Sequence, residues 1–217
     1  MTAQLIPPRF LFRYSVPIRQ REPLWATEGD ELDESYRLPN LLSLDGVKPF
    51  ADVRAAWSPA GLVFSVQVEG KRQPPWCRET RPDESDGLRL WLDTRDTRNI
   101  HRATRFCHHF VFLPTGAGRT LDEPVAEQLL INRAKEHAKP IRPGSLLARR
   151  KKRLNDYVME VFIPAASLTG FDPVDHPKLG FTYMVIDREL GTQTFNCPAE
   201  MPFHDDPSLW ATIELAS

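Results

Sequence analysis

A strict alternation of apolar and polar residues is the feature that most constrains the fold of this chain. It is clearest over residues 87–93, with the sequence GLRLWLD, in which every second residue is a leucine. The alternation recurs at residues 62–69 and 157–163. Because successive side chains of a β-strand point to opposite faces, each of these segments predicts a half-buried strand.

Other strands are predicted where β-branched and aromatic residues gather between turn signals. The sequence SPAG at residues 58–61 is such a turn, and it makes the flanking segments a hairpin. Residues 123–138 fit either a helix or a strand, and that choice stays open. Residues 165–168 allow a single helical turn at most. The predicted strands are residues 51–57, 62–69, 87–93, 105–113, 157–163, 179–187 and 210–215.

Proline indicates where the strands are interrupted. The chain has 20 prolines in 217 residues, and proline has no N–H to donate to a strand ladder. Most lie in the first 40 residues, in residues 70–86 and in residues 173–207, which predicts long, stiff loops there. We expect Pro114 and Pro164 to end strands. Seven or eight short strands with long proline-rich connections predict an all-β fold, a β-sandwich or jelly roll.

The N-terminal segment differs from the rest of the chain. Residues 1–47 show no sustained period of 2 or 3.6, so we predict an irregular lead-in packed on the domain. One strand is expected near residues 10–16. The acidic run from Asp30 to Glu34 is expected to be a solvated loop. Residues 48–217 are then expected to form the β-sandwich.

Charge and hydropathy exclude several functions. With 28 Lys and Arg against 29 Asp and Glu, the chain has no overall field to attract nucleic acid or an anionic membrane. No segment approaches the ~18 apolar residues of a membrane span. Prolines and arginines interrupt the first 16 residues, which argues against a secretory signal. Cys77, Cys107 and Cys197 are far apart, which favours reduced thiols. We therefore expect a cytoplasmic protein, or a secreted one if a leader precedes this sequence.

Several segments, in this order, resemble those of family 9 carbohydrate-binding modules and their DOMON-like relatives. AWSPAGLVF at residues 56–64 resembles their opening hairpin, and SDGLRLWLD at residues 85–93 resembles a strand that follows it. FVFLPTG at residues 110–116 lies where they have a strand ending in glycine. YVMEVFIPAASL at residues 157–168 resembles their E-x-x-I-P-W/F-x-x-L segment. The resemblance covers about residues 48–217. It implies a jelly-roll β-sandwich of two antiparallel sheets that binds sugar without catalysis.

Candidate ligand-binding residues follow from the chemistry of sugar recognition. Aromatic rings stack on the apolar faces of pyranose rings, while carboxylates, amides and arginines bind the hydroxyls. The resemblance implies two tryptophans around a terminal sugar, with Trp76 as one wall and Trp210 as a candidate for the second. Trp91 is an alternative, because alternation puts it on a polar face. Candidate hydroxyl contacts are Asp86, Arg89, Arg102 and Arg105.

Metal sites have weaker signals. Asp93 and Asp96 supply oxygen ligands suited to calcium, and the resemblance implies that a structural calcium can occur. Cys107 and His109 share one face of a predicted strand, but His108 faces the other way. Two ligands do not make a structural zinc site, which needs four. No cofactor is expected to be required.

No catalytic motif is present: the chain has no G-x-S-x-G, no P-loop and no G-x-G-x-x-G. Three functions therefore remain open. The first is non-catalytic carbohydrate binding. The second is a protein-interaction or scaffold domain with no sugar ligand. The third is hydrolysis by paired carboxylates such as Asp205 with Asp206, or Glu84 with Asp86, or association with a glycoside hydrolase. The basic run at residues 149–153 is expected to be a solvated strand edge or turn, because such residues discourage edge pairing.

Overall fold

A computed structural model of the chain describes residues 12–26, 31–39, 41, 44 and 46–216. Strands dominate these residues, and the helical elements whose bounds are described are 3-10 turns of three residues each. None of these turns is long or apolar enough to cross a membrane. The turns are η2 (Glu34–Tyr36), η4 (Ala165–Ser167) and η5 (Pro207–Leu209).

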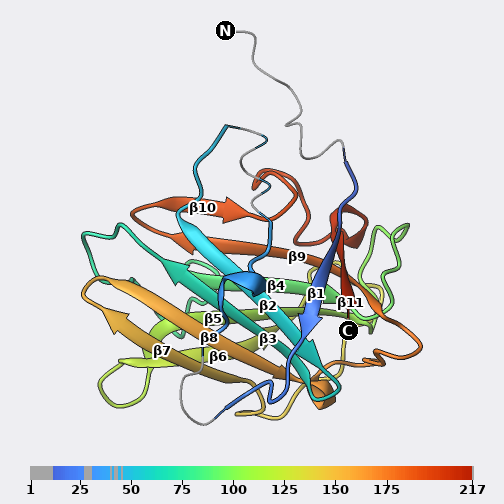
Figure 1. The fold of residues 1–217 in the computed structure, drawn as a ribbon, viewed down its shortest axis with the longest axis horizontal. Coiled ribbons are helices and arrows are strands. Elements are labelled where there is room, and N and C mark those ends of the chain that lie inside the picture. Colours follow the sequence, from blue (N-terminus) through green and yellow to red (C-terminus); the bar gives the residue numbers. More distant parts are fainter. Residues whose placement is uncertain (1–11, 27–30, 40, 42–43, 45, 217) are drawn as a thin grey trace, which may run out of the picture.

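Eleven strands lie in the described residues, and Figure 1 shows their arrangement. They are β1 (Ser15–Gln20), β2 (Ala51–Ser58), β3 (Gly61–Val68), β4 (Gly87–Asp93), β5 (Cys107–Ala117), β6 (Glu123–Leu129), β7 (Leu147–Arg153), β8 (Asp156–Pro164), β9 (Lys178–Asp187), β10 (Gly191–Thr194) and β11 (Ala211–Ala216). The seven strands predicted from alternation and composition are all present.

The strands form one hydrogen-bonded path that folds over into two layers. Its order is β6-β5-β4-β9-β11-β1-β2-β3-β8-β7, with β10 paired to β9. One layer holds β6, β5, β4 and β9, the other holds β2, β3, β8 and β7, and both are antiparallel. At the two ends of the path, β6 and β7 approach each other, so the sandwich is nearly closed. The predicted all-β sandwich is confirmed.

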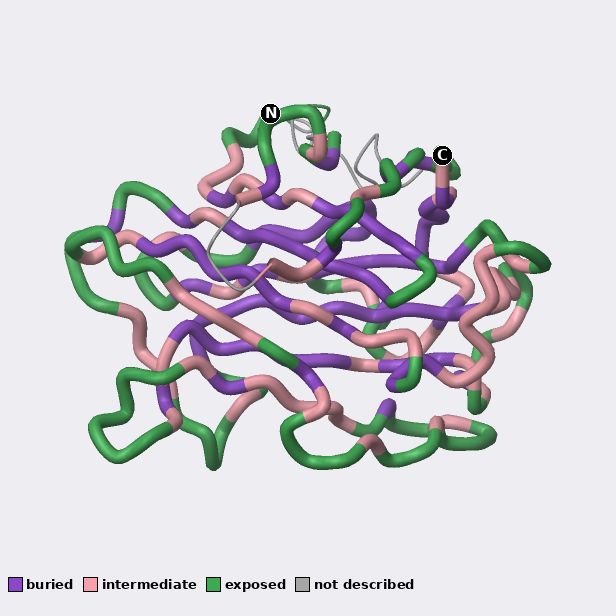
Figure 2. The backbone as a smooth tube through the Cα atoms, turned by 60° about the horizontal axis from the view of Figure 1, so that its bottom comes forward, coloured by how far each residue is buried: buried purple, intermediate pink, exposed green. Residues whose placement is uncertain are grey.

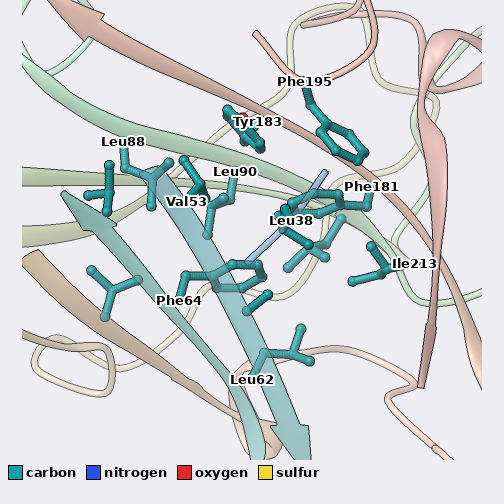
Figure 3. Packing of buried hydrophobic residues seen from close by; sticks show 14 of the residues in the cluster. Leu38, Val53, Leu62, Phe64, Leu88, Leu90, Phe181, Tyr183, Phe195 and Ile213 are labelled. Atoms are coloured by element: carbon teal, nitrogen blue, oxygen red, sulfur yellow. The ribbon is translucent and has the colours of Figure 1, made fainter. Parts of the chain in front are cut away.

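The core lies between the two layers. Phe64 of β3 and Phe181 of β9 are fully buried, and their rings stack with centroids 5.7 Å apart (Figure 3). Leu88, Leu90 and Leu92 are also fully buried, as the alternation in GLRLWLD predicts. Figure 2 shows that buried residues follow the central strands, whereas exposed residues gather on the surrounding loops.

The N-terminal segment is more ordered than its sequence predicts. Residues 15–20 form β1, which runs parallel to β11 on one side and to β2 on the other and so joins the two layers. The strand expected near residues 10–16 is therefore shifted, and residues 10 and 11 lie outside the described part. Val16 and Ile18 enter the core. The boundary between residues 47 and 48 stays a prediction.

The acidic run is only partly described, because Asp30 lies outside the described residues. Glu31 accepts a hydrogen bond from Lys151 at 2.9 Å, so it is paired as well as solvated. The Asp33 carboxylate accepts a hydrogen bond from the backbone N–H of Ser35 and caps η2.

Three prolines lie inside strands, although Pro114 was expected to end a strand and Pro17 to belong to the irregular lead-in. Pro114 does not end β5, because the strand continues to Ala117 across an irregularity in its pairing with β6. Pro124 of β6 lies at the same irregularity. Pro17 of β1 lies beside β11, and β1 pairs with β2 only from Arg19 onward. Each proline therefore sits where the ladder needs no N–H from it.

The segments whose structure the sequence did not decide form strands. Residues 123–129 form β6, so a strand rather than a helix occupies the start of the ambiguous segment. The basic run forms most of β7, an edge strand of the path, as expected of residues that discourage edge pairing. Strand β10 was not predicted, because its four residues, GTQT, are too few to show an alternation.

Candidate functional site

Hydrogen bonds between Trp76 and Asp86 close the second half of the loop of residues 70–86. The backbone N–H of Trp76 donates to Asp86 Oδ2 at 2.9 Å, and the N–H of Asp86 donates back to the Trp76 carbonyl at 2.9 Å. The Cys77 thiol donates to the Asp86 carbonyl. Trp76 is therefore held beside the start of β4, with its indole partly exposed.

A buried group of charges holds the first half of the same loop. The Lys71 ammonium forms an ion pair with Asp187 and lies 3.6 Å from Asp86 Oδ2. No more than 1% of any of these three side chains is exposed. The remaining oxygen of Asp187 accepts hydrogen bonds from the N–H groups of Glu189 and Leu190, each at 3.0 Å. Lys71 therefore ties the loop to the end of β9, 116 residues further along the chain.

Asp86 belongs to this support and not to an exposed surface. Burial raises its pKa, while hydrogen bonds from the N–H groups of Trp76 and Arg188 and the charge of Lys71 oppose that rise. Because its two oxygens accept these hydrogen bonds, Asp86 fixes the backbone of Trp76 and of Arg188 from the buried side of the loop. The structure thus brings Asp86 to Trp76, but with only 1% of the residue exposed.

Arg89 is also buried. Its Nη2 donates to the carbonyls of Pro82, at 2.6 Å, and Ser85, at 2.8 Å, and its Nη1 has no hydrogen-bond partner in the described structure. Burial lowers the pKa of its guanidinium to about 10. Arg89 therefore holds the end of the 70–86 loop from below, and a ligand would not reach it in this conformation.

Trp76 lines a surface hollow of about 290 Å³, which we call the Trp76 hollow. It is lined by residues from segments 74–77, 115–122 and 150–157, so both layers contribute to it. Two guanidinium groups, of Arg78 and Arg188, lie over the Trp76 ring, each 5.2 Å from its centroid. The hollow combines a partly exposed aromatic face with hydrogen-bonding groups, which is the chemistry of a small polar ligand site.

Trp210 lies at the other end of the sandwich. It packs near Gly180, which pairs with Asp93 at the end of β4, whereas Trp76 lies at the start of β4. Seven residues of extended strand place these two ends ~20 Å apart. The Trp210 indole donates to the Phe203 carbonyl at 2.6 Å and lines a separate hollow of about 450 Å³. Trp76 and Trp210 therefore do not hold one sugar ring between them.

Trp91 is 1% exposed, contrary to the polar face that alternation predicts for it. Its ring stacks on His109, with centroids 4.4 Å apart, and meets Phe203 edge-on at 5.3 Å. Distant loops cover this outer face of β4 and make a second apolar cluster, so Trp91 is not open to a ligand here. The cluster comprises Trp91, Ala103, Cys107, Ile131, Cys197, Phe203 and Trp210.

The two other arginines are not near Trp76. Arg105 precedes β5, whose first residue, Cys107, pairs with Asp93 at the far end of β4. Its side chain is 57% exposed and lies over the ring of Phe106. Arg102 donates to the Arg133 carbonyl at 2.8 Å.

The carboxylates of the calcium candidates, Asp93 and Asp96, already have partners within the protein. Asp93 accepts hydrogen bonds from the N–H groups of Arg95, at 3.0 Å, and Thr97, at 2.7 Å. Asp96 accepts a hydrogen bond from the Thr212 hydroxyl at 2.9 Å and forms an ion pair with Arg98. Across the described ranges, no group of three or more His, Cys, Asp or Glu residues could hold a metal ion.

The Cys107-His108-His109 segment alternates as expected. Cys107 lies in the outer cluster, and burial raises the pKa of its thiol to about 12. His108 stacks on Phe110, and its Nε2 accepts a hydrogen bond from the N–H of Thr169 at 3.0 Å. His109 lies on the face of β5 opposite to His108 and stacks on Trp91.

The acidic pairs considered for hydrolysis have other partners. Asp206 lies 3.1 Å from His101 and accepts a hydrogen bond from Ser208. Glu84 forms an exposed ion pair with Arg81, whereas Asp86 is buried. Neither of these residues lines the Trp76 hollow.

Solved structures with similar folds include a family 9 carbohydrate-binding module and a putative carbohydrate-binding protein. A family 9 carbohydrate-binding module from Caldicellulosiruptor kristjanssonii in complex with cellotriose is 13% identical, with a TM-score of 0.60 and 94% of each chain covered. A structure of such a module from the same organism with glucose is 14% identical, with a TM-score of 0.60, covering 94% of this chain and 96% of the other. A putative carbohydrate-binding protein from Bacteroides uniformis is 13% identical, with a TM-score of 0.54, covering 94% and 100%. No family model and no curated protein matches the sequence. The fold is therefore that of a family 9-like carbohydrate-binding module.

Sequence reasoning missed several residues around Trp76. Arg188 follows β9, and Arg150, Lys152 and Asn155 belong to β7 and the turn after it. No local signal links them to Trp76, because only the folding of the two layers brings these segments to one hollow.

Proposed function

We propose that this domain binds a carbohydrate, without catalysis, in the Trp76 hollow. The observation that carries the proposal is a partly exposed tryptophan at the edge of a hollow that also contains polar and charged side chains. The solved sugar complexes of the same fold support it.

The composition of the hollow suits a sugar. The indole of Trp76 offers a flat apolar face for the C–H groups of a pyranose ring. Asn155, Asp156 and Arg150 line the same hollow and can bind hydroxyl groups. A volume of about 290 Å³ is at the small end of the ~300–1,000 Å³ of ligand pockets, which favours one sugar unit over a long chain.

The arginines over Trp76 do not prevent this binding. Arg78 and Arg188 are both exposed, and a cation–π contact of an exposed arginine contributes only about 0.5–1 kcal/mol. A sugar can displace one guanidinium from the ring at small cost. The displaced group then lies next to the sugar and can donate hydrogen bonds to its hydroxyls.

Replacing Trp76 with alanine is expected to weaken sugar binding roughly 30-fold, because truncating a central aromatic contact costs about 2 kcal/mol. Calorimetric titration with a panel of mono- and disaccharides that includes glucose measures the affinity. Trp25→Ala is the matched control, because Trp25 is also half-buried and lies under a guanidinium, that of Arg149 at 4.2 Å. Trp25 does not line the Trp76 hollow, so the Trp25→Ala variant should bind sugar with the affinity of the unaltered protein. Unchanged affinity in Trp76→Ala would remove the proposal.

A further inference from the structure

We propose that the ligand of the Trp76 hollow is an acidic carbohydrate, a sugar unit that carries a carboxylate such as a uronate. This inference rests on the proposed function and specifies its substrate class. The observation behind it is the convergence of four basic side chains on Trp76 and its hollow: Arg78, Arg188, Arg150 and Lys152.

The four groups come from three separate segments. Arg78 lies in the same loop as Trp76 and Arg188 directly after β9, and both guanidiniums lie 5.2 Å from the centroid of the Trp76 ring. Arg150 and Lys152 lie two residues apart on β7, so they share one face of that strand, and both line the hollow.

None of these four side chains has a carboxylate within 4.0 Å among the described residues, which distinguishes them from their neighbours. On the opposite face of β7, Arg149 pairs with Glu160 at 2.6 Å, and Lys151 pairs with Glu31 at 2.9 Å. The basic side chains on one face of β7 are therefore paired with carboxylates. Those on the face that lines the Trp76 hollow have no carboxylate partner among the described residues and can bind an anionic ligand.

The acidic groups nearby do not balance the four cations. Asp122 and Asp156 line the hollow together with Arg150 and Lys152, so the basic and acidic residues of the lining are equal in number. Arg78 and Arg188, over the Trp76 ring, add two positive charges to this set. One oxygen of Asp156 already accepts a hydrogen bond from the backbone N–H of Lys71 at 2.8 Å. Glu189, beside Arg188, accepts hydrogen bonds from the N–H groups of Arg72 and Gln73. The positive charge that these acids do not balance is therefore that of the two guanidiniums over the Trp76 ring.

Protection of a sheet edge explains only part of this arrangement. Inward-pointing charges on an edge strand discourage pairing with other chains, and Arg150 and Lys152 could serve that purpose alone. Edge protection does not require Arg78 and Arg188, which lie on the Trp76 ring and not on β7. An arginine beside an aromatic face matches a uronate, because the ring stacks on the indole while the planar guanidinium binds the carboxylate through two hydrogen bonds.

Calorimetric titration of the unaltered chain with the methyl glycosides of glucose and glucuronate tests this inference. These two ligands differ only in a hydroxymethyl group against a carboxylate. We expect glucuronate to bind at least ~10-fold more tightly, because a hydrogen bond to a charged group contributes enough for that factor. The preference should shrink when salt rises from about 50 mM to about 500 mM, because salt screens exposed charges.

Three variants locate the preference. Arg188→Gln and Arg150→Gln are each expected to lower the affinity for glucuronate ~10-fold more than the affinity for glucose, so that the preference for the acidic sugar disappears. Lys151→Gln, on the opposite face of β7, should change neither affinity. Equal affinities for the two glycosides, or a preference that survives in both arginine variants, would overturn this inference and leave the proposed function standing. Absence of binding to either sugar and to the disaccharide panel would overturn both.

Discussion

Lowering the pH from about 7.5 to about 5.5 is expected to reduce the free energy of unfolding by about 3 kcal/mol through His108 and His109. Burial lowers the pKa of His108 to about 4 and that of His109 to about 3, and for His109 the charges of Arg89 and His204 add to the effect. An unfolded histidine titrates near ~6.5. The unfolded chain therefore binds two protons that the folded chain excludes, so stability falls as the pH falls below about 6.5. Each histidine accounts for about 1.4 kcal/mol over this interval.

Urea unfolding at the two pH values measures this loss. This pH window keeps the carboxylates of the unfolded chain ionised. In the folded chain, burial raises the pKa values of Asp86, Asp93 and Glu127, and these groups can only oppose the loss caused by the histidines. His109→Phe preserves the stacking with Trp91 and removes the titrating group, so its loss should be about half that of the unaltered chain. His137→Gln, at an exposed position, is the control and should lose as much as the unaltered chain. A stability that does not vary with pH in this window would refute the prediction.

Replacing Lys71 with methionine is expected to destabilise the fold by about 3–5 kcal/mol, because it leaves two buried carboxylates without their cation. Asp86 and Asp187 both have side chains no more than 1% exposed, and Lys71 lies between them. Methionine has a similar volume, so packing changes little and the loss reports the unpaired charge.

Denaturant unfolding at neutral pH measures this destabilisation. Lys178→Met is the matched control, because Lys178 pairs with Glu214 at 3.8 Å with both side chains about half exposed, and such a pair contributes about 0–1 kcal/mol. The double variant Lys71→Met with Asp187→Asn should recover part of the loss, because it also removes one of the stranded charges. A loss below about 1 kcal/mol in Lys71→Met would show that the buried pair does not hold the loop.

The Lys71 group also connects stability to function. It fixes the start of the loop that presents Trp76, and Asp86 fixes the middle of the same loop through the Trp76 backbone. Because Lys71 and Asp86 are buried next to Trp76 and do not line the hollow, we expect them to position the ring for the proposed ligand without contacting that ligand.

The strands and the fold class could be read from the sequence because strand alternation is a local property. The pattern GLRLWLD predicts β4 with its bounds, and it assigns the three leucines to the core. Prolines were a less reliable guide. Pro17, Pro114 and Pro124 fit inside strands because no strand pairing needs a backbone N–H from these positions. The sequence does not show where such pairing is interrupted.

The site depended on tertiary structure. Alternation places Trp91 on the outer face of β4, but whether that face meets water depends on loops about 100 residues away that carry Cys197 and Phe203. Likewise, the family resemblance offers Trp76 and Trp210 as two walls of one site, but they lie at opposite ends of the sandwich. Sequence alone determined that this chain is a β-sandwich with a tryptophan in a long loop. Only the folded structure decided which tryptophan stays accessible and which charges surround it, because burial and charge pairing are set by segments that are distant along the chain.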